Sequence, residues 1–349
     1  MYTPFVQIIL TLAFLPLMYF MSMKVRLKFL TFMGAVVLVV FSPASFWVLL
    51  LLSLEALLLE RFLRTLPKKS LRRQYLPYLL LINMFYTDLA RGIFSDEGLR
   101  SLAVGFSVIR VFMTTKQLLG AKSTESAERR WSVLAGAYFF PALVVGPVFS
   151  GTTLWKQSTE DRQVPIRFEF NYRKLFGGWI LASLIAPAIW LRAGDMEIDL
   201  PTLFPEMCLL FVYLFATFWG RSLISEGGAA LAGFEVPQNF DKPWLAKDIK
   251  DFWSRWHISM SRFVTQYIFL PLNLRGMKPA QATVVAFVFM GFWHQVRPGY
   301  ILWGLAHGIL IAKAPSAASI NSFVIRFLYR MATLAFVVYL SYVANYAFR

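Results

Sequence analysis

The sequence contains a single cysteine, Cys208, among 349 residues. One thiol cannot build an internal disulfide framework or a Cys-x-x-Cys metal or redox site. Charged residues are also scarce, at 15% of the chain against 58% hydrophobic residues. A soluble protein with so little charge could not cover its surface, whereas helices surrounded by lipid have no such need. The composition therefore predicts an integral membrane protein, and we expect no bound metal or cofactor.

Acidic residues are few as well, because 19 Asp and Glu stand against 35 Lys and Arg, for a net charge of +16. The basic residues gather at the ends of apolar runs, above all at 24–28 and 61–73. Such clusters favour cytoplasmic loops beside anionic lipid headgroups over nucleic-acid binding. The two runs between these clusters should form a hairpin that turns at residues 42–45, with the N-terminus outside. The first run lacks a basic segment before it and a cleavage signature after it, so we expect a retained span.

Apolar runs of membrane-spanning or near-spanning length recur along the chain and predict an all-α, multi-pass protein. Several are shorter than the roughly 20 residues of a perpendicular span, so some should be re-entrant, tilted or buried. We expect about 9 to 11 spans in one membrane-embedded domain over residues 1–349, with the chemistry in residues 237–313. The runs cover about 5–23, 29–42, 45–60, 75–86, 99–113, 131–149, 176–192, 202–219, 263–274, 281–294, 299–313 and 322–348.

Between Pro237 and Ser261 charged and aromatic residues alternate. Apolar positions 245, 249, 252, 253 and 256 follow helical spacing, which predicts an amphipathic helix at the membrane interface. That helix would bring His257 to the membrane boundary and place Trp253 and Ser261 on the same face. Such a face is either the wall of a binding site or part of an interfacial aromatic belt. Its basic side, which carries Lys242, Lys247 and Lys250, suits either a cytoplasmic loop or the docking of an acidic carrier protein.

All three histidines of the chain lie in two stretches, 251–272 and 291–308. Imidazole is the side chain best suited to move protons near neutral pH, and an ionisable group at membrane depth is costly enough to indicate a function. His294 follows a nearly uninterrupted apolar run, so its position favours a functional role. His307 lies on the next run, where we favour a structural hydrogen bond between helices.

Several catalytic motifs are absent, namely the Gly-x-Ser-x-Gly elbow, the His-Glu-x-x-His zinc motif and the Walker loop. His257 is followed by ISMSR and His294 by QVRPG, so neither starts a His-x4-Asp signature. A base without a protein nucleophile suits direct transfer, in which it takes the proton of an acceptor hydroxyl that attacks an activated carbonyl. Acyl transfer from a thioester fits these residues.

The two histidine-containing stretches resemble the bacterial membrane-bound O-acyltransferases, a group that includes alginate O-acetyltransferases and the D-alanyl transferases of teichoic acids. The resemblance rests on DFWSRWHISMSRF, YIFLPL, GFWH and WGLAHG. Weaker similarity upstream extends it to roughly residues 40–313. It implies a ring of tilted helices around a thinned centre, crossed by a tunnel that joins a cytoplasmic donor to an acceptor outside, in the bacterial inner membrane.

By motif, His294 corresponds to the catalytic histidine of that family and His257 to its second, upstream histidine. The resemblance implies that His294 is the general base and that His257 orients or polarises the donor carbonyl. Residues around the two histidines form the expected donor- and substrate-binding set, namely Trp253, Arg255, Trp256, Ser261 and Trp293.

The expected reaction moves an acetyl, D-alanyl or similar small acyl group to a hydroxyl of a cell-envelope glycan or another extracytoplasmic acceptor. The donor is either a phosphopantetheine thioester on an acyl carrier protein or acyl-CoA. Membrane lipids surround the protein, and an extracytoplasmic acyltransferase- or esterase-like partner is compatible with this scheme. Nucleic acid is not an expected partner.

Two alternatives stay open. A multi-span transporter or flippase would use the histidines in a proton pathway, although no matching pair of broken helices is visible in the sequence. A scaffold without catalysis would recruit a separate enzyme or pass the acyl group to it, and Gln295 keeps this alternative open, because it stands where the family usually has glycine after the catalytic histidine.

Overall fold

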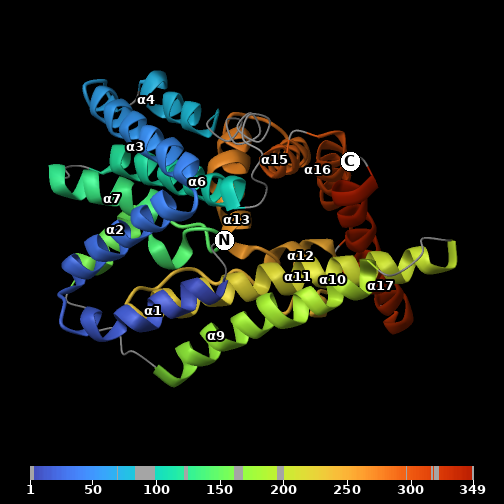
Figure 1. The fold of residues 1–349 in the computed structure, drawn as a ribbon. Coiled ribbons are helices and arrows are strands. Elements are labelled where there is room, and N and C mark those ends of the chain that lie inside the picture. Colours follow the sequence, from blue (N-terminus) through green and yellow to red (C-terminus); the bar gives the residue numbers. More distant parts are fainter. Residues whose placement is uncertain are drawn as a thin grey trace. The chain divides into compact units, whose positions relative to one another are not determined.

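The computed structural model describes residues 4–68, 70–82, 99–121, 125–160, 168–194, 200–295, 297–315, 317 and 322–347. All regular secondary structure in these residues is helical (Figure 1), which confirms the predicted all-α class. By packing, the chain divides into two compact units. The first comprises Met1–Ile180 and Gly220–Pro237, and the second comprises Leu181–Trp219 and Gln238–Arg349.

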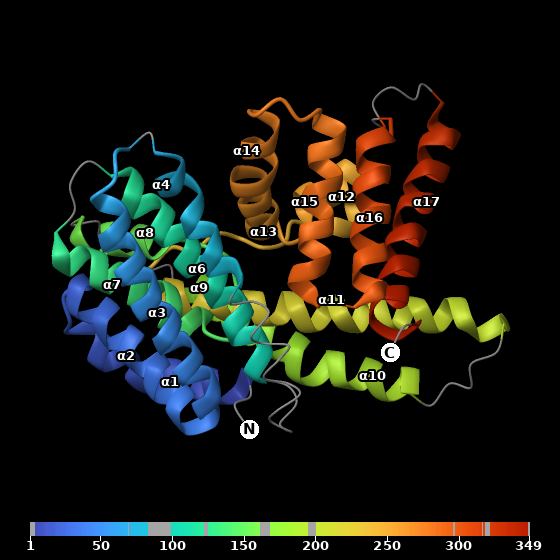
Figure 2. The ribbon, with the colours of Figure 1, turned by 90° about the horizontal axis from the view of Figure 1, so that it is seen from above.

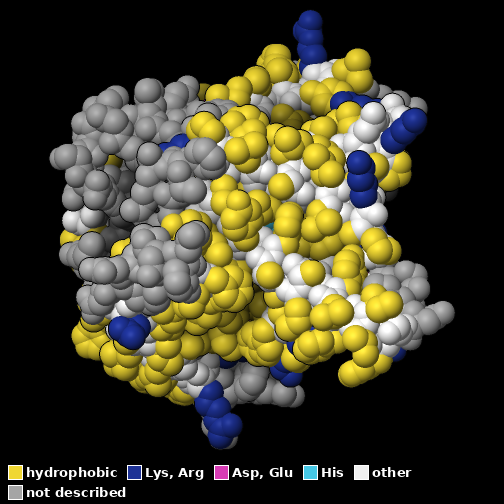
Figure 3. Space-filling view, turned by 90° about the vertical axis from the view of Figure 1, so that its right-hand side faces the viewer, with side chains coloured by type: hydrophobic (Ala, Val, Ile, Leu, Met, Phe, Trp, Pro, Cys, Tyr) yellow, Lys and Arg dark blue, Asp and Glu magenta, His cyan; other side chains and the backbone are white. Residues whose placement is uncertain are grey.

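Three helical stretches in the described residues are long and apolar enough to cross a membrane: Asn171–Ala193, Leu203–Leu231 and Phe323–Asn345. Other apolar helices are shorter, such as the 16 residues of α15 and of α16. At about 1.5 Å per residue, such a helix falls short of the ~30 Å hydrocarbon layer. Among the described residues on the face in Figure 3, hydrophobic side chains are the most abundant, as expected of a lipid-facing surface. The count of 9 to 11 spans, the ring, the tunnel and the single domain stay predictions.

The first unit begins with three helices joined by short connections. Ser42 alone separates α2 from α3, so the predicted chain break is confirmed at Ser42, whereas residues 43–45 of the predicted turn belong to α3. The cause is local, because Pro43 has no backbone N–H and is favoured in the first turn of a helix. The helices of this unit are α1 (Pro4–Tyr19), α2 (Met23–Phe41), α3 (Pro43–Arg64), α4 (Leu71–Tyr75), η1 (Leu76–Ile82), α6 (Leu99–Gly120), α7 (Ser126–Tyr138), η2 (Phe140–Ala142), α8 (Gly151–Thr159) and α9 (Phe168–Ile180).

The apolar run at 131–149 is not one helix. Helix α7 ends at Tyr138, and residues 139–150 form a short 3-10 turn followed by irregular backbone. Pro141 and Pro147 interrupt the helical hydrogen-bond pattern there. Every residue from Phe139 to Ser150 is buried, which satisfies the rule that irregular backbone at membrane depth must be covered by protein.

The second unit contains the histidine-bearing helices, and Figure 2 shows α15, α16 and α17 standing side by side. Its helices are η3 (Leu181–Ile185), α10 (Ala186–Gly194), the first part of α11 (Leu200–Leu231), η4 (Pro243–Leu245), α12 (Ile249–Arg255), α13 (Ile258–Val264), η5 (Thr265–Phe269), α14 (Leu270–Asn273), α15 (Pro279–His294), α16 (Pro298–Lys313), α17 (Phe323–Tyr342) and η7 (Val343–Ala347).

The single amphipathic helix predicted over residues 237–261 is wrong. The segment contains the 3-10 turn η4, the short helix α12 and the start of α13. Asp248 begins α12, because its carboxylate accepts a hydrogen bond from the backbone N–H of Asp251 at 2.8 Å. The chain then breaks at Trp256 and His257, where His257 adopts the left-handed backbone conformation at φ 44°. Trp253 therefore lies on α12, whereas His257 caps the start of α13, the helix that contains Ser261, so the three residues do not share one helix.

Glycines allow α15 and α16 to pack with their backbones in contact. A Cβ atom added at Gly304 would collide with the carbonyl oxygen of Phe287 and lie 3.0 Å from the Cα of Val288. A Cβ at Gly291 would collide with the carbonyl oxygen of Tyr300. Close helix packing through small residues is typical of membrane proteins. It places His294 at the end of α15 beside the aromatic residues of α16.

Candidate functional site

All three histidines line one cavity in the second unit. It contains about 760 Å³ of space not filled by protein atoms, including its open end. His257 comes from the break between α12 and α13, His294 from the end of α15 and His307 from the middle of α16. Most of the wall is aromatic or aliphatic, and the polar groups are few. Besides the histidines, the lining comprises Phe211, Leu214, Phe218, Phe252, Trp253, Trp256, Met260, Ser261, Met290, Trp293, Tyr300, Trp303, Val337, Ser341, Ala344 and Asn345.

His294 is the last residue of α15, and its side chain is exposed. Its ring stacks on that of Tyr300, with centroids 5.3 Å apart and planes 14° from parallel. The rings of Trp293 and Trp303 contact the His294 ring edge-on, with centroid distances of 4.8 and 5.5 Å. The aromatic contacts hold the imidazole in place while leaving it accessible, as a proton-transferring group requires.

His257 is buried and is held by a polar partner far away in sequence. Its Nδ1 lies 3.2 Å from Oδ1 of Asn239, which also accepts a hydrogen bond from the Ser259 hydroxyl at 2.5 Å. Because an amide oxygen only accepts, the neutral ring carries its proton on Nδ1 and has an unprotonated Nε2. In this form Nε2 can accept a proton or a hydrogen bond. It could polarise a carbonyl only if the ring were doubly protonated.

His257 and His294 share one aromatic neighbour, the indole of Trp293. The ring of Trp293 contacts both imidazoles, with centroids 6.1 Å from His257 and 4.8 Å from His294. Sequence reasoning selected both histidines and this tryptophan, and the fold places all three on the cavity wall. The short connection between α12 and α13 thus lies beside the end of α15.

Three other predicted binding residues also line the cavity: Trp253, Trp256 and Ser261. The Ser261 hydroxyl donates to the carbonyl oxygen of Trp253 at 3.1 Å, so the two residues are close even though the chain breaks between them. Trp256 stacks on Phe252 with centroids 5.5 Å apart and planes 19° from parallel. This wall is a packed aromatic cluster rather than one face of a helix.

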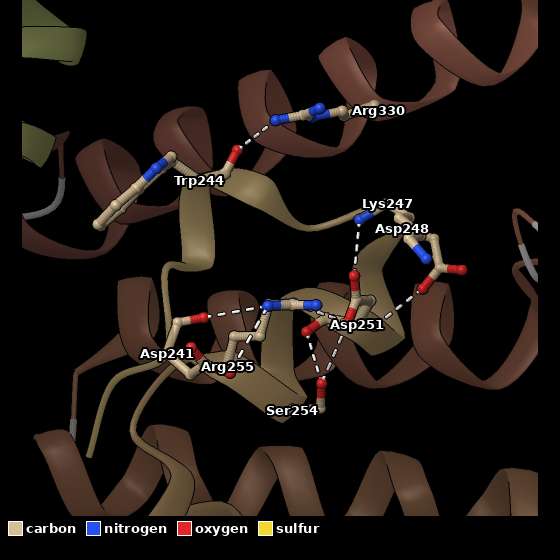
Figure 4. A network of polar contacts seen from close by, with 8 residues as sticks. All are labelled: Asp241, Trp244, Lys247, Asp248, Asp251, Ser254, Arg255 and Arg330. Atoms are coloured by element: carbon tan, nitrogen blue, oxygen red, sulfur yellow. Dashed lines mark hydrogen bonds and ion pairs between the residues drawn. The ribbon is translucent and has the colours of Figure 1, made fainter. Parts of the chain in front are cut away.

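Arg255 does not line the cavity. Its guanidinium lies between two carboxylates (Figure 4), with Nε 2.8 Å from Oδ1 of Asp251 and Nη1 3.7 Å from Oδ2 of Asp241. Burial raises the pKa of Asp251, but hydrogen bonds from the Lys247 N–H and from Arg255 outweigh this effect, so the pKa is lowered. The carboxylate therefore stays charged at neutral pH, and its contribution to stability is lost only as the pH falls through that lowered value. Through these two ion pairs Arg255 holds Asp241, in the segment before α12, against α12 itself.

The expected structural bond of His307 to another helix is wrong. The ring hydrogen bonds within its own helix, with Nδ1 2.9 Å from the carbonyl oxygen of Trp303 one turn earlier. Its ring lines the cavity. The position of His307 on an apolar run could not show whether its ring bonds another helix or its own.

Gln295, which replaces the usual glycine, has extended backbone at φ −173° and ψ 146°. Any residue adopts this conformation, so the fold does not require glycine here. Its N–H donates to the carbonyl oxygen of Gly291 at 3.2 Å and ends α15 regularly. Glutamine is therefore compatible with the regular end of α15 at His294.

Sequence reasoning missed Asn239, Tyr300 and Asn345. The Tyr300 hydroxyl donates to Oδ1 of Asn345 at 2.7 Å, which fixes the ring that stacks on His294. Asn345 is one of few polar residues in the last apolar run, and that rarity was a usable signal. Asn239 offered none, because it precedes His257 by 18 residues and no sequence spacing pairs the two side chains.

Replacing Asn239 with alanine is expected to destabilise the second unit by about 1–3 kcal/mol, because buried donors of His257 and Ser259 lose their shared acceptor. Without this acceptor the proton of the neutral His257 ring should no longer be fixed on Nδ1. The ¹⁵N chemical shifts of the imidazole measure this change of tautomer. Asn273→Ala is the matched control, since it removes an amide that bonds only a carbonyl at the end of α14. Equal unfolding midpoints for the two variants, with an unchanged His257 spectrum, would contradict the role of Asn239.

Comparison with protein families finds a match to the membrane-bound O-acyltransferase family over residues 46–348. Teichoic acid D-alanyltransferase of Bacillus subtilis is 36% identical over 195 residues, covering 50% of this chain and 48% of that protein. The Streptococcus thermophilus enzyme of the same name is 34% identical over 155 residues, covering 41% and 36%. Peptidoglycan O-acetyltransferase of Helicobacter pylori is 28% identical over 194 residues, covering 50% and 35%. The matched part spans about half or less of the length of each relative.

Proposed function

Because the chain belongs to the membrane-bound O-acyltransferase family, we propose that it transfers a small acyl group from a cytoplasmic thioester to a hydroxyl of an extracytoplasmic envelope polymer. The observation that supports this most directly is the convergence of three histidines on one aromatic cavity with an exposed His294. The relatives are named for D-alanylation of teichoic acid and O-acetylation of peptidoglycan or alginate. An envelope glycan or a related polymer in the bacterial inner-membrane setting is the corresponding acceptor.

In the proposed mechanism His294 takes the proton of the acceptor hydroxyl as its oxygen attacks the thioester carbonyl. A new C–O bond forms, and the tetrahedral intermediate then breaks its C–S bond. The leaving thiolate receives the proton held by His294, so ester and free thiol are the products. The aromatic wall of Trp293, Tyr300 and Trp303 limits water near the reacting carbonyl and so disfavours hydrolysis.

His257 acts as the positioning partner in this scheme. Its Nδ1–H is directed at Asn239, and Nε2 in the neutral ring is a hydrogen-bond acceptor. We therefore assign it to orient a reactant or to assist proton movement near His294. Polarisation of the donor carbonyl by His257 would need the doubly protonated ring.

The presence of ester-linked acyl groups on envelope material tests the proposal. Cells that produce the protein should carry alkali-labile acyl groups on a purified envelope polymer, and cells that lack it or carry His294→Ala should not. Equal acylation in all three strains would contradict the proposed function. A transporter would instead give substrate uptake in vesicles without acyl incorporation.

For the donor we propose an acidic acyl carrier protein that docks on the basic face around η4 and α12. Lys242 and Lys247 are exposed there, whereas Lys250 is engaged, with Nζ 3.0 Å from the carbonyl oxygen of Ala314. The first two side chains can thus meet a partner without breaking a contact of the fold. Complementary charge would steer the association. Acyl-CoA is the alternative donor.

Lys242→Glu and Lys247→Glu, made separately, are expected to weaken carrier binding and to reduce its salt dependence, because each reverses one steering charge. Unfolding midpoints should change little. Lys278→Glu, at an exposed position before α15, is the matched control. Binding measured by surface plasmon resonance at two salt concentrations distinguishes them, and equal affinities for all variants would exclude docking on this face.

A further inference from the structure

In the described part of the chain, one ring nitrogen of His307 has a hydrogen-bond partner and the other has none. Its side chain is 0% exposed, and Nδ1 lies 2.9 Å from the carbonyl oxygen of Trp303. A carbonyl only accepts, so Nδ1 carries the proton and Nε2 of the neutral ring is an acceptor. Within the part of the chain that the structure describes, Nε2 is buried and has no hydrogen-bond partner. The fold thus fixes the tautomer and leaves an unused acceptor.

Trp253 supplies the complementary group next to it. Its ring packs edge-to-face against that of His307, with centroids 5.4 Å apart and planes 87° from parallel. The indole Nε1–H is a donor only, and it too is buried without an acceptor among the described residues. Among the described residues, the ring with an unused donor and the ring with an unused acceptor are therefore in contact, and both side chains line the cavity that contains His294.

The chemistry of this pair selects its ligand. A buried polar group without a partner destabilises the folded protein, so a ligand group that satisfies both is bound favourably. A hydroxyl does so with one oxygen, because that oxygen accepts from the indole N–H and donates its own hydrogen to the imidazole. A carbonyl or an ionised carboxylate has no hydrogen to donate, and an ammonium has no lone pair to accept.

We propose that Trp253 Nε1 and His307 Nε2 form a hydroxyl-binding subsite that holds a second hydroxyl of a polyhydroxylated acceptor while its reacting hydroxyl lies at His294; this assignment of the occupant depends on the proposed function. The Trp303 ring lies next to both positions, because its centroid is 5.5 Å from that of the His294 ring and 4.6 Å from that of the His307 ring. An acceptor with several hydroxyls, such as a sugar or glycerol unit, can span this aromatic face. His307 is then a specificity-determining residue.

Binding to the subsite is measured through the indole N–H resonance of Trp253 in the full-length protein in nanodiscs, with glycerol as the probe. The Trp253→Phe variant identifies the resonance by its loss. Glycerol should move it downfield in the wild type and in His294→Gln, but not in His307→Phe, which keeps the ring and removes the acceptor. Methyl acetate, which cannot donate a hydrogen bond, should have a smaller effect. No shift with glycerol, or the same shift in His307→Phe, would overturn the subsite.

The KM values for different acyl acceptors then test whether a second hydroxyl of the acceptor occupies the subsite. With glycerol as acyl acceptor, His307→Phe should raise KM about tenfold, the effect of one lost hydrogen bond. The KM for 1-propanol, which has only the reacting hydroxyl, should change little. Equal increases for both alcohols would overturn the second-hydroxyl assignment. A wild-type protein that binds glycerol at Trp253 yet transfers no acyl group to any alcohol would contradict the proposed function and support the subsite.

Discussion

His294→Ala is expected to lower acyl transfer by about 10²- to 10⁴-fold, the usual range for loss of a general acid–base group. The ring is at the end of α15, and its contacts there are with the aromatic rings of Trp293, Tyr300 and Trp303. Its removal takes away the proton acceptor without breaking a backbone interaction. Initial rates of ester formation with purified protein, donor and acceptor provide the measurement.

Thr283→Ala is the control for this variant. Thr283 lies on the same helix, outside the cavity, and its hydroxyl bonds only the carbonyl oxygen of Pro279 one turn earlier. It should keep the wild-type rate, and both variants should insert and unfold like the wild type. Transfer at the wild-type rate by His294→Ala would end the assignment of this histidine as the base.

Gly304→Ala is expected to destabilise the packing of α15 against α16, because the added methyl group meets backbone rather than a mobile side chain. It collides with the carbonyl oxygen of Phe287, so α15 and α16 must move apart. Overpacking of this kind costs about 1–3 kcal/mol. Because the contact sets the distance between the aromatic residues of α16 and His294, transfer should fall together with the unfolding midpoint in detergent.

Gly177→Ala is the matched control, since a Cβ atom at this helical glycine meets no other heavy atom within 4 Å. Alanine is favoured over glycine in a helix, so this change should be neutral or slightly stabilising. If the two variants unfold at the same temperature, close packing at Gly304 does not hold the helix pair together.

Much of the helical fold was predictable from local pattern. The turn at Ser42 follows from Pro43 and the change in apolar run, and α15 and α16 correspond closely to the runs at 281–294 and 299–313. These features depend on nearest neighbours and on the cost of burying charge in lipid. The failures came where proline or a side-chain cap interrupts an apolar pattern, as at Pro141 and Asp248.

The residue types of the site were visible in the sequence, but the directions of their side chains were not. His257, His294 and Trp293 could be selected because histidine and tryptophan are informative beside apolar runs. The family resemblance placed Arg255 with the binding residues, whereas in the fold it pairs with Asp241 and Asp251. A one-dimensional pattern does not record which carboxylates a distant loop brings near a guanidinium.

Composition and apolar patterning alone established a helical membrane protein with a few ionisable groups gathered in two stretches, because the cost of placing charge in lipid acts on each segment separately. The tautomers of His257 and His307 and the shared cavity required folding in three dimensions. They depend on contacts such as that between Asn239 and His257 and on the close approach of α15 and α16 at Gly304. Residues distant in the chain make these contacts only once the helices pack, and no local preference encodes them.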